Sequence, residues 1–198
     1  MISTTISKHH WNYFLSLEDD LAKVARYIEF TEHNLSAYSI ELARILLSAS
    51  SEVDVLLKQL CFFIDKNAKA NNINHYQNII GVHLREFSNE TVFIHCYGFK
   101  FNPWEAWLQD KNPSWWKSHT QVKHHRHEYF HKATLENAIT AMGALYVAVG
   151  YFYQFKFQEE YQKKSIVINM NKTCELLKPS PKLFQFKAEY HRHPTYIY

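Results

Sequence analysis

The sequence predicts a mainly α-helical fold, a helical bundle with a small inserted β-hairpin and an irregular C-terminal tail. Glycine and proline are rare, four and five among 198 residues, against roughly 12% for the two together in average usage. Few turn residues favour long helices over many short strands. Apolar residues make up 46% of the chain and recur at helical spacing over long stretches, which is typical of helices that bury one face.

The first part of the chain contains three expected helices, over residues 17–30, 36–66 and 75–84. The second helix has the strongest periodicity, because its apolar residues step by three or four positions throughout. These residues are Tyr38, Leu42, Ile45, Ala49, Val53, Leu56, Leu60 and Phe63. A stripe of this length predicts a helix that contributes one face to the core.

The middle of the chain changes character at residues 91–101, where two β-prone runs flank Gly98. This pattern predicts a small hairpin inserted between helices. Asn102 and Pro103 then supply a helix cap and a first-turn proline, so a brief helix is expected to follow the hairpin.

A helix of up to about forty residues is expected from Ser114, since no proline follows until Pro179. Gly143 and Gly150 share one face of it, and another helix could approach closely there, either in ordinary bundle packing or across a dimer seam. Residues 137–155 carry no formal charge. This uncharged segment is just longer than the minimum length of a helix that spans a bilayer. Polar residues and many Ala or Gly favour a buried bundle helix instead.

The expected domain organisation is a bundle over residues 1–158 and a partly irregular C-terminal extension over 159–198. Within the extension, residues 165–168 could form a strand and residues 179–181 a linker. Residues 191–198 form a basic, aromatic tail whose order the sequence leaves open.

Composition restricts the function classes. The three cysteines are odd in number and far apart, so neither a disulfide framework nor a cysteine zinc site is indicated. The N-terminus lacks the basic-then-apolar order of a signal peptide, and we therefore expect a cytoplasmic protein with no membrane contact. The net charge is only +3, with a basic excess in the C-terminal part; it permits an anionic partner such as RNA without requiring one.

Titratable groups are concentrated between His119 and His131, where five of the 13 histidines fall. One interpretation is an exposed, histidine-rich helical turn without a chemical role. A second interpretation is zinc, because His127, Glu128 and His131 match the His-Glu-x-x-His spacing of metallohydrolases. Against zinc, basic residues flank the pattern and the third histidine of the extended pattern is missing.

A third interpretation starts from Arg126 and His131, which are separated by four residues, with His127 directly after the arginine. Together with the tryptophan pair before it and the Ala-rich helix after it, this segment resembles the HEPN superfamily. Members have a motif of Arg, four to six residues and His near the start of the last long helix. The helical run over residues 41–58 is also similar to these proteins, so the likeness covers about residues 15–157.

The resemblance implies metal-independent endoribonuclease activity in a homodimer, without a cofactor, as in a toxin or defence effector. Some members are nuclease-inactive binding or neutralising modules, which is the alternative. The implied partners are RNA, a second copy of the chain and a cognate antitoxin or regulatory protein. The implied catalytic residues are Arg126, His131 and His127, the RNA-binding residues are Lys123, His124 and Lys132, and no metal ligand is implied.

Physical chemistry agrees with these roles, because an arginine can hold a phosphate with two charge-assisted hydrogen bonds and histidine moves protons near neutral pH. On a straight helix, however, residues five apart differ in direction by about 140°. Arg126 and His131 therefore require a kink in the helix or a site shared between two chains. Glu52 or Asp54 could supply a counter-charge from the second helix.

Overall fold

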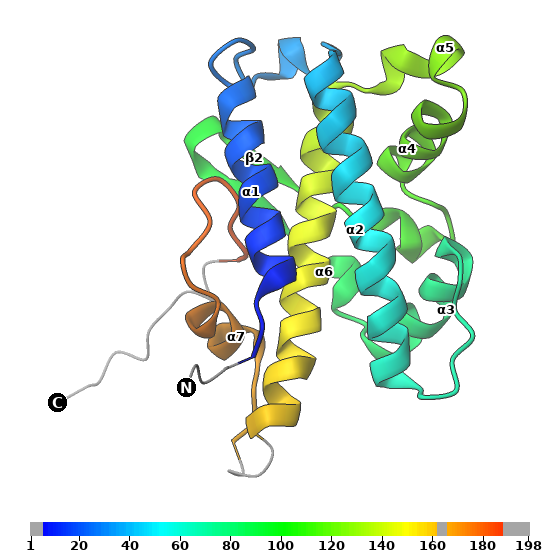
Figure 1. Cartoon of the computed structure of the whole chain (residues 1–198), viewed down its shortest axis with the longest axis vertical. Coiled ribbons are helices and arrows are strands. Elements are labelled where there is room, and N and C mark those ends of the chain that lie inside the picture. Colours follow the sequence, from blue (N-terminus) through cyan, green and yellow to red (C-terminus); the bar gives the residue numbers. More distant parts are fainter. Residues whose placement is uncertain (1–5, 162–165, 188–198) are drawn as a thin grey trace, which may run out of the picture.

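The computed structural model describes residues 6–161 and 166–187, and in these residues the predicted mainly α-helical bundle is confirmed. Its central pair is α2 (Ile40–Ile64) and α6 (Leu135–Tyr161), with α1 (His9–Val24) on one side and α3 (Ile73–His83) and α4 (Ser114–His124) on the other (Figure 1). A single-turn helix, α5 (Arg126–Tyr129), follows α4, and α7 (Met170–Leu176) lies near the far end of α6.

The two central helices run in the same direction and begin side by side. Ser39 caps α2 by accepting a hydrogen bond from the Leu42 amide at 3.1 Å, and the Leu135 amide at the start of α6 donates to the Ala37 carbonyl at 2.8 Å. The predicted stripe of α2 is buried except at its ends, where Tyr38 is exposed and Phe63 half-buried. This stripe is therefore the core face that the sequence predicted.

Helix α6 is buried along most of its length, as the sequence predicted. It is long and apolar enough to cross a membrane, but 83% of its apolar window is buried inside the described part of the bundle. Gly143 and Gly150 do permit close approach, since a Cβ atom would lie 2.5 Å from the Phe101 ring and 2.9 Å from the Phe186 ring, respectively. Within the chain, the close neighbours of both glycines are aromatic rings and not another helix.

The predicted hairpin is confirmed as β1 (Val92–Ile94) paired antiparallel with β2 (Phe99–Phe101). A 3₁₀ turn over His95–Tyr97 joins the strands, and Gly98 follows it in the left-handed region at φ 71°, which glycine adopts without steric cost. The brief helix after the hairpin is a 3₁₀ helix over Glu105–Gln109. Two further 3₁₀ turns lie at Glu32–Asn34 and Phe87–Asn89.

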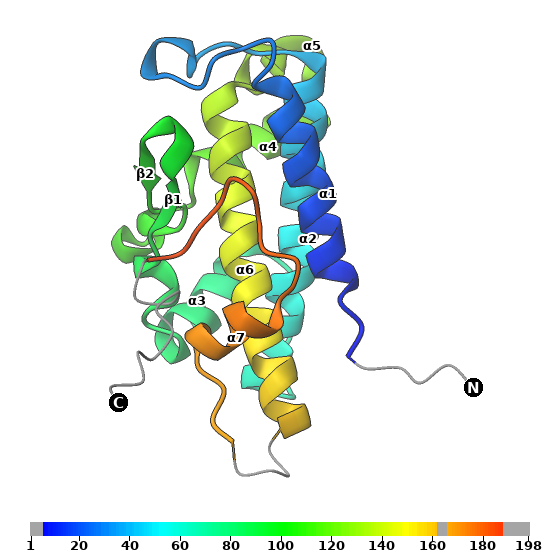
Figure 2. The ribbon, with the colours of Figure 1, turned by 90° about the vertical axis from the view of Figure 1, so that its left-hand side faces the viewer.

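The C-terminal segment that the structure describes packs against the bundle. Figure 2 shows residues beyond α7 crossing in front of α6 toward the hairpin, where Gln185 and Phe93 exchange two backbone hydrogen bonds of 2.9 Å. The buried carboxylate of Glu18 accepts hydrogen bonds from three successive backbone amides, at residues 182–184, over 2.8–3.1 Å. Residues 166–168 form no strand; residue 165 and the basic tail lie outside the described residues.

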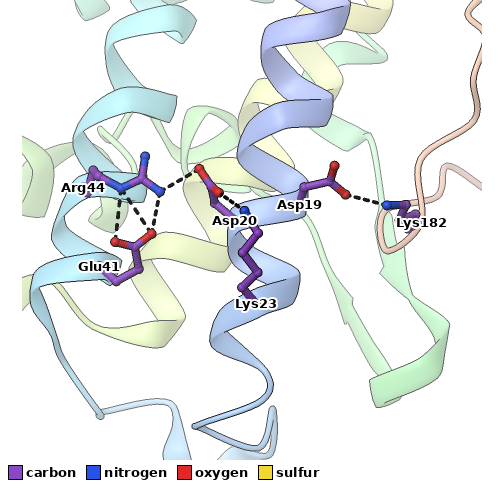
Figure 3. Close-up of polar contacts among 6 residues, drawn as sticks. All are labelled: Asp19, Asp20, Lys23, Glu41, Arg44 and Lys182. Carbon is purple, nitrogen blue, oxygen red and sulfur yellow. Dashed lines mark hydrogen bonds and ion pairs between the residues drawn. The ribbon is translucent and has the colours of Figure 1, made fainter.

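Ion pairs on the surface connect α1 with α2 and α1 with the C-terminal segment (Figure 3). Arg44 on α2 donates to Asp20 on α1 at 2.6 Å and to Glu41 at 2.5 Å. Lys182 of the C-terminal segment pairs with Asp19 at 2.6 Å. Exposed pairs of this kind contribute little to stability individually, so the buried aromatic and aliphatic side chains remain the main source of stability.

Two expected helices differ clearly from the observed ones, whereas α2 and α3 differ from the expected 36–66 and 75–84 only at their ends. The first runs over His9–Val24 and not over 17–30, because its buried face extends toward the N-terminus through Trp11 and Phe14. The single helix expected from Ser114 is wrong. The chain leaves the helical conformation at His125, with φ −136° and ψ 47°, and regains a long helix only at Leu135.

Candidate nucleic-acid interface

The six residues singled out in the sequence occupy three short consecutive elements at one end of the bundle. Lys123 and His124 end α4, Arg126 and His127 belong to α5, and His131 and Lys132 lie in a 3₁₀ turn over Phe130–Lys132. All six side chains are exposed. The structure therefore brings them together on one solvent-facing segment, at the end of the bundle where α2 and α6 begin (Figure 1).

Contacts with the start of α2 and α6 hold this segment in place. The Phe130 ring packs edge-on against the Tyr38 ring, with ring centroids 5.8 Å apart. The Asn137 side-chain amide donates to the Lys132 carbonyl at 2.9 Å. Thr134 accepts a hydrogen bond from the Asn137 amide at 3.2 Å, so α6 starts anew after the exposed turns.

The charge of the segment is mainly positive. Its one acid, Glu128, lies 3.4 Å from the His127 imidazole, and both side chains are largely exposed. An exposed pair of this kind is weak, so the surrounding lysines, arginine and histidines are available to an anionic ligand.

The zinc pattern does not lie on one continuous α-helix. Two histidines four positions apart face the same side only on a continuous helix, whereas His127 lies in α5 and His131 in the 3₁₀ turn that follows. Among residues 6–161 and 166–187, no three His, Cys, Asp or Glu side chains are grouped so that they could hold a metal ion.

The two acids suggested as counter-charges, Glu52 and Asp54, lie on different sides of α2. Glu52 pairs with the imidazole of His10 on α1, on the other side of α2. Asp54 accepts a hydrogen bond from the Tyr76 hydroxyl at 2.8 Å and pairs with Lys58 at 2.6 Å. Asp54 is the acid on the side of α4, and its carboxylate raises the pKa of Tyr76 in addition to the larger effect of burial.

Asp54 also lines a pocket of about 230 Å³ between α2 and α4, here called the α2–α4 pocket. Helix α2 contributes Ser50, Ser51 and Asp54, and α4 contributes Trp116, His119, Thr120, Lys123 and His124. The pocket thus contains two of the residues predicted to bind RNA and connects them with buried polar groups.

His119 is the most perturbed of these groups. Its side chain is only 8% exposed, and burial lowers its pKa to about 4, with the nearby Lys123 and His124 as secondary causes. The imidazole is therefore neutral at pH 7, with one nitrogen that donates and one that accepts a hydrogen bond. Its Nδ1 atom and the Ser50 hydroxyl are buried and have no hydrogen-bond partner among the described residues.

The sequence predicted Lys123 and His124 as RNA-binding residues and Asp54 as a counter-charge, but it did not predict that they form one pocket with Ser50, Ser51, Trp116, His119 and Thr120. A usable signal was present on α4, because Trp116, His119, Thr120 and Lys123 are spaced by three, one and three positions and so share one helix face. No signal in the sequence alone indicated which face of α2 would meet them.

Comparisons with protein-family models, with curated proteins and with solved structures found no match to this chain.

Proposed function

We propose that this chain is a metal-independent endoribonuclease of the HEPN type, active in the cytoplasm as a homodimer. One observation carries the proposal: the α-helix that begins at Arg126 ends at Tyr129, within the motif, and His131 lies in the 3₁₀ turn that follows, with both side chains exposed. Because the α-helix does not continue through His131, the offset of about 140° that a straight α-helix imposes does not apply to this pair. This release supports joint action on one phosphate.

In the proposed reaction the 2′-oxygen of the RNA attacks the adjacent phosphorus, and the bond from phosphorus to the 5′-oxygen breaks. Arg126 holds the phosphate oxygens by a two-pronged contact. His131 takes the proton from the 2′-hydroxyl or returns one to the leaving 5′-oxygen, and His127 serves as the second proton-transfer group. The products carry a 2′,3′-cyclic phosphate and a 5′-hydroxyl.

Lys123, His124 and Lys132 bind the flanking phosphates in this proposal. They are exposed beside the motif, and cationic side chains contribute a salt-dependent affinity for the RNA backbone. We place the physiological role with toxins or defence effectors that a cognate antitoxin or regulatory partner restrains.

The homodimer would use the apolar surface next to the motif. Tyr38 and Ile40 are 53% and 79% exposed, and the contact of Tyr38 with Phe130 links them to the exposed turns. An Ile40→Glu variant should lower the dimer fraction in sedimentation velocity, and it should lower cleavage in parallel. A monomeric wild-type protein would contradict this part of the proposal.

The decisive experiment incubates the purified protein with total RNA in EDTA. We expect cleavage with cyclic-phosphate ends, and loss of cleavage in His131→Ala while the melting temperature stays unchanged. Under the alternative, a nuclease-inactive binding module, the wild-type protein would bind RNA or a partner protein and leave the RNA intact. Cleavage that EDTA abolishes would instead favour a metal-dependent hydrolase.

A further inference from the structure

The α2–α4 pocket lies close to the proposed cleavage motif. Lys123 and His124 line it, and Arg126 follows His124 by two residues, which span at most about 8 Å of chain. A group bound in the pocket would therefore be a near neighbour of any phosphate that Arg126 holds.

The size of the pocket limits what can enter it. Its volume of about 230 Å³ is below the ~300–1,000 Å³ of typical small-molecule sites. It has room for roughly eight water molecules at ~30 Å³ each. A single aromatic ring with its substituents fits this space, whereas a larger cofactor does not.

The polar groups of the wall lack partners in the protein. Ser50 is fully buried and His119 is 8% exposed, and the Ser50 Oγ and His119 Nδ1 atoms make no hydrogen bond within residues 6–161 and 166–187. Buried polar atoms are nearly always satisfied in folded proteins. Two such exceptions in the wall of one pocket point to a polar ligand toward which a hydroxyl and an imidazole can turn.

The pocket also contains an aromatic surface. The Trp116 ring is half-buried, and its centroid lies 5.4 Å from that of the His119 ring. Half-exposed aromatic rings are the usual platform for unpaired bases, because each base has a face on which to stack.

The wall of the pocket that α2 forms carries an acid and no cation. Asp54 contributes a carboxylate that the Tyr76 hydroxyl and Lys58 hold in place. A fixed carboxylate repels a phosphate and accepts hydrogen bonds from the amino group of a base, as acidic side chains do with cytosine. The cation at the rim, Lys123, is exposed and could hold an adjoining phosphate outside the pocket.

From these features we propose that the α2–α4 pocket binds one unpaired base of an RNA strand, with a preference for cytosine, next to the phosphate held at Arg126. The inference rests on the proposed ribonuclease function and adds its base specificity. Trp116 stacks on the base, Asp54 accepts from its amino group, and Ser50 and His119 contact the remaining polar edge.

The test measures binding separately from cleavage. Fluorescently labelled single-stranded oligonucleotides of rC, rU, rA and rG are titrated against the His131→Ala protein, in which cleavage is expected to be lost. We expect rC to bind roughly tenfold more tightly than rU, the low end of what one good base contact provides. Asp54→Asn should reduce that preference to less than about twofold, because the amide presents both a donor and an acceptor.

Asp65→Asn is the matched control, since it removes the same charge from an exposed residue at the C-terminal end of α2. It should retain the preference for rC. Trp116→Ala should weaken all four oligonucleotides, and Trp116→Phe should restore most of the affinity because it restores the stacking surface. Equal affinity for the four sequences, equal effects of Asp54→Asn and Asp65→Asn, or no binding of any oligonucleotide would each overturn the proposal.

The failures of the two proposals are distinguishable. Cleavage in EDTA that depends on Arg126 and His131 but ignores the base sequence would remove the base pocket and leave the ribonuclease. Conversely, the wild-type protein could leave RNA intact while the protein still prefers rC and loses that preference with Asp54→Asn. This result would support the base pocket and the nuclease-inactive binding module.

Discussion

The exposed segment over residues 123–132 and helix α6 follow each other in the chain but have opposite surroundings. In the segment, eight of the ten side chains are exposed and the other two, Tyr129 and Phe130, are half-buried. In α6, the residues from Ala141 to Tyr153 are all buried. Substitutions in the segment should therefore affect RNA cleavage and have little effect on the free energy of unfolding. Substitutions in α6 should affect the free energy of unfolding and have little direct effect on cleavage.

The largest expected effect is on catalysis. Arg126→Ala should lower the RNA cleavage rate by roughly 10²–10⁴, because it removes the phosphate contact from the transition state. Arg126→Lys should recover only part of that loss, since lysine keeps the charge but not the two-pronged geometry. Cleavage rates and thermal melts of both variants check this prediction.

Arg85→Ala is the control for this experiment, because Arg85 is also exposed but lies outside the segment. It should leave both the cleavage rate and the melting temperature unchanged. A large fall in melting temperature with Arg126→Ala would contradict the expectation that residues of the exposed segment contribute to cleavage and not to stability.

A smaller effect concerns His119, which lies between the exposed segment and the core. Burial lowers its pKa from 6.5 to about 4 in the folded state, so the unfolded chain binds the proton more readily between these two values. Stability should therefore fall as the pH drops below about 6.5, by about 2 kcal/mol between pH 7 and pH 5 at 1.36 kcal/mol per pKa unit. Urea unfolding of the wild-type protein and His119→Gln at both pH values isolates this contribution.

The glutamine variant should lose less stability on acidification than the wild-type protein, because it has no imidazole at this position to protonate. Identical pH dependence in the two proteins would show that His119 titrates as a solvated histidine and that the α2–α4 pocket is wetter than its burial indicates.

In α6 the corresponding prediction concerns Gly150. A Cβ atom there would lie 2.9 Å from the Phe186 ring, which is only 2% exposed and stacks on Tyr146 at 4.3 Å. Gly150→Ala should lower the free energy of unfolding by about 1–2 kcal/mol, because overpacking outweighs the better helix propensity of alanine. Gly81→Ala in α3 meets no atom within 4 Å and should gain about 0.5–1 kcal/mol; chemical denaturation of both variants checks the opposite signs.

The comparison also explains what the sequence could predict. The stripe of α2 was predictable, because its burial follows from spacing within one helix. The position of the hairpin was predictable from the β-prone runs around Gly98. Both depend on residues that are close in the chain.

The break at His125 was not predictable, because the contacts that stabilise it join distant residues. Phe130 contacts Tyr38, and the Leu135 amide donates to the Ala37 carbonyl, so the start of α2 determines where α6 begins. The α2–α4 pocket has the same origin, because Ser50 and Asp54 meet α4 only in the folded bundle. Helix geometry predicted a kink or a shared site for Arg126 and His131; the α-helix does end between them, at Tyr129, and the shared site stays a prediction.

The smallest destabilisation is expected at Thr134, on the boundary between the exposed segment and α6. Its hydroxyl accepts a hydrogen bond from the Asn137 amide at 3.2 Å, one of the first amides of α6, which otherwise lack partners within the helix. Thr134→Ala should cost about 1 kcal/mol. Thr140→Ala is the matched control: the Thr140 hydroxyl donates to the Glu136 carbonyl at 2.7 Å inside α6, and alanine's helix propensity compensates for that bond. Urea unfolding should therefore separate two identical substitutions six residues apart. If both variants lower the free energy of unfolding by the same amount, then the Thr134 cap does not stabilise the start of α6 more than a hydrogen bond inside the helix does.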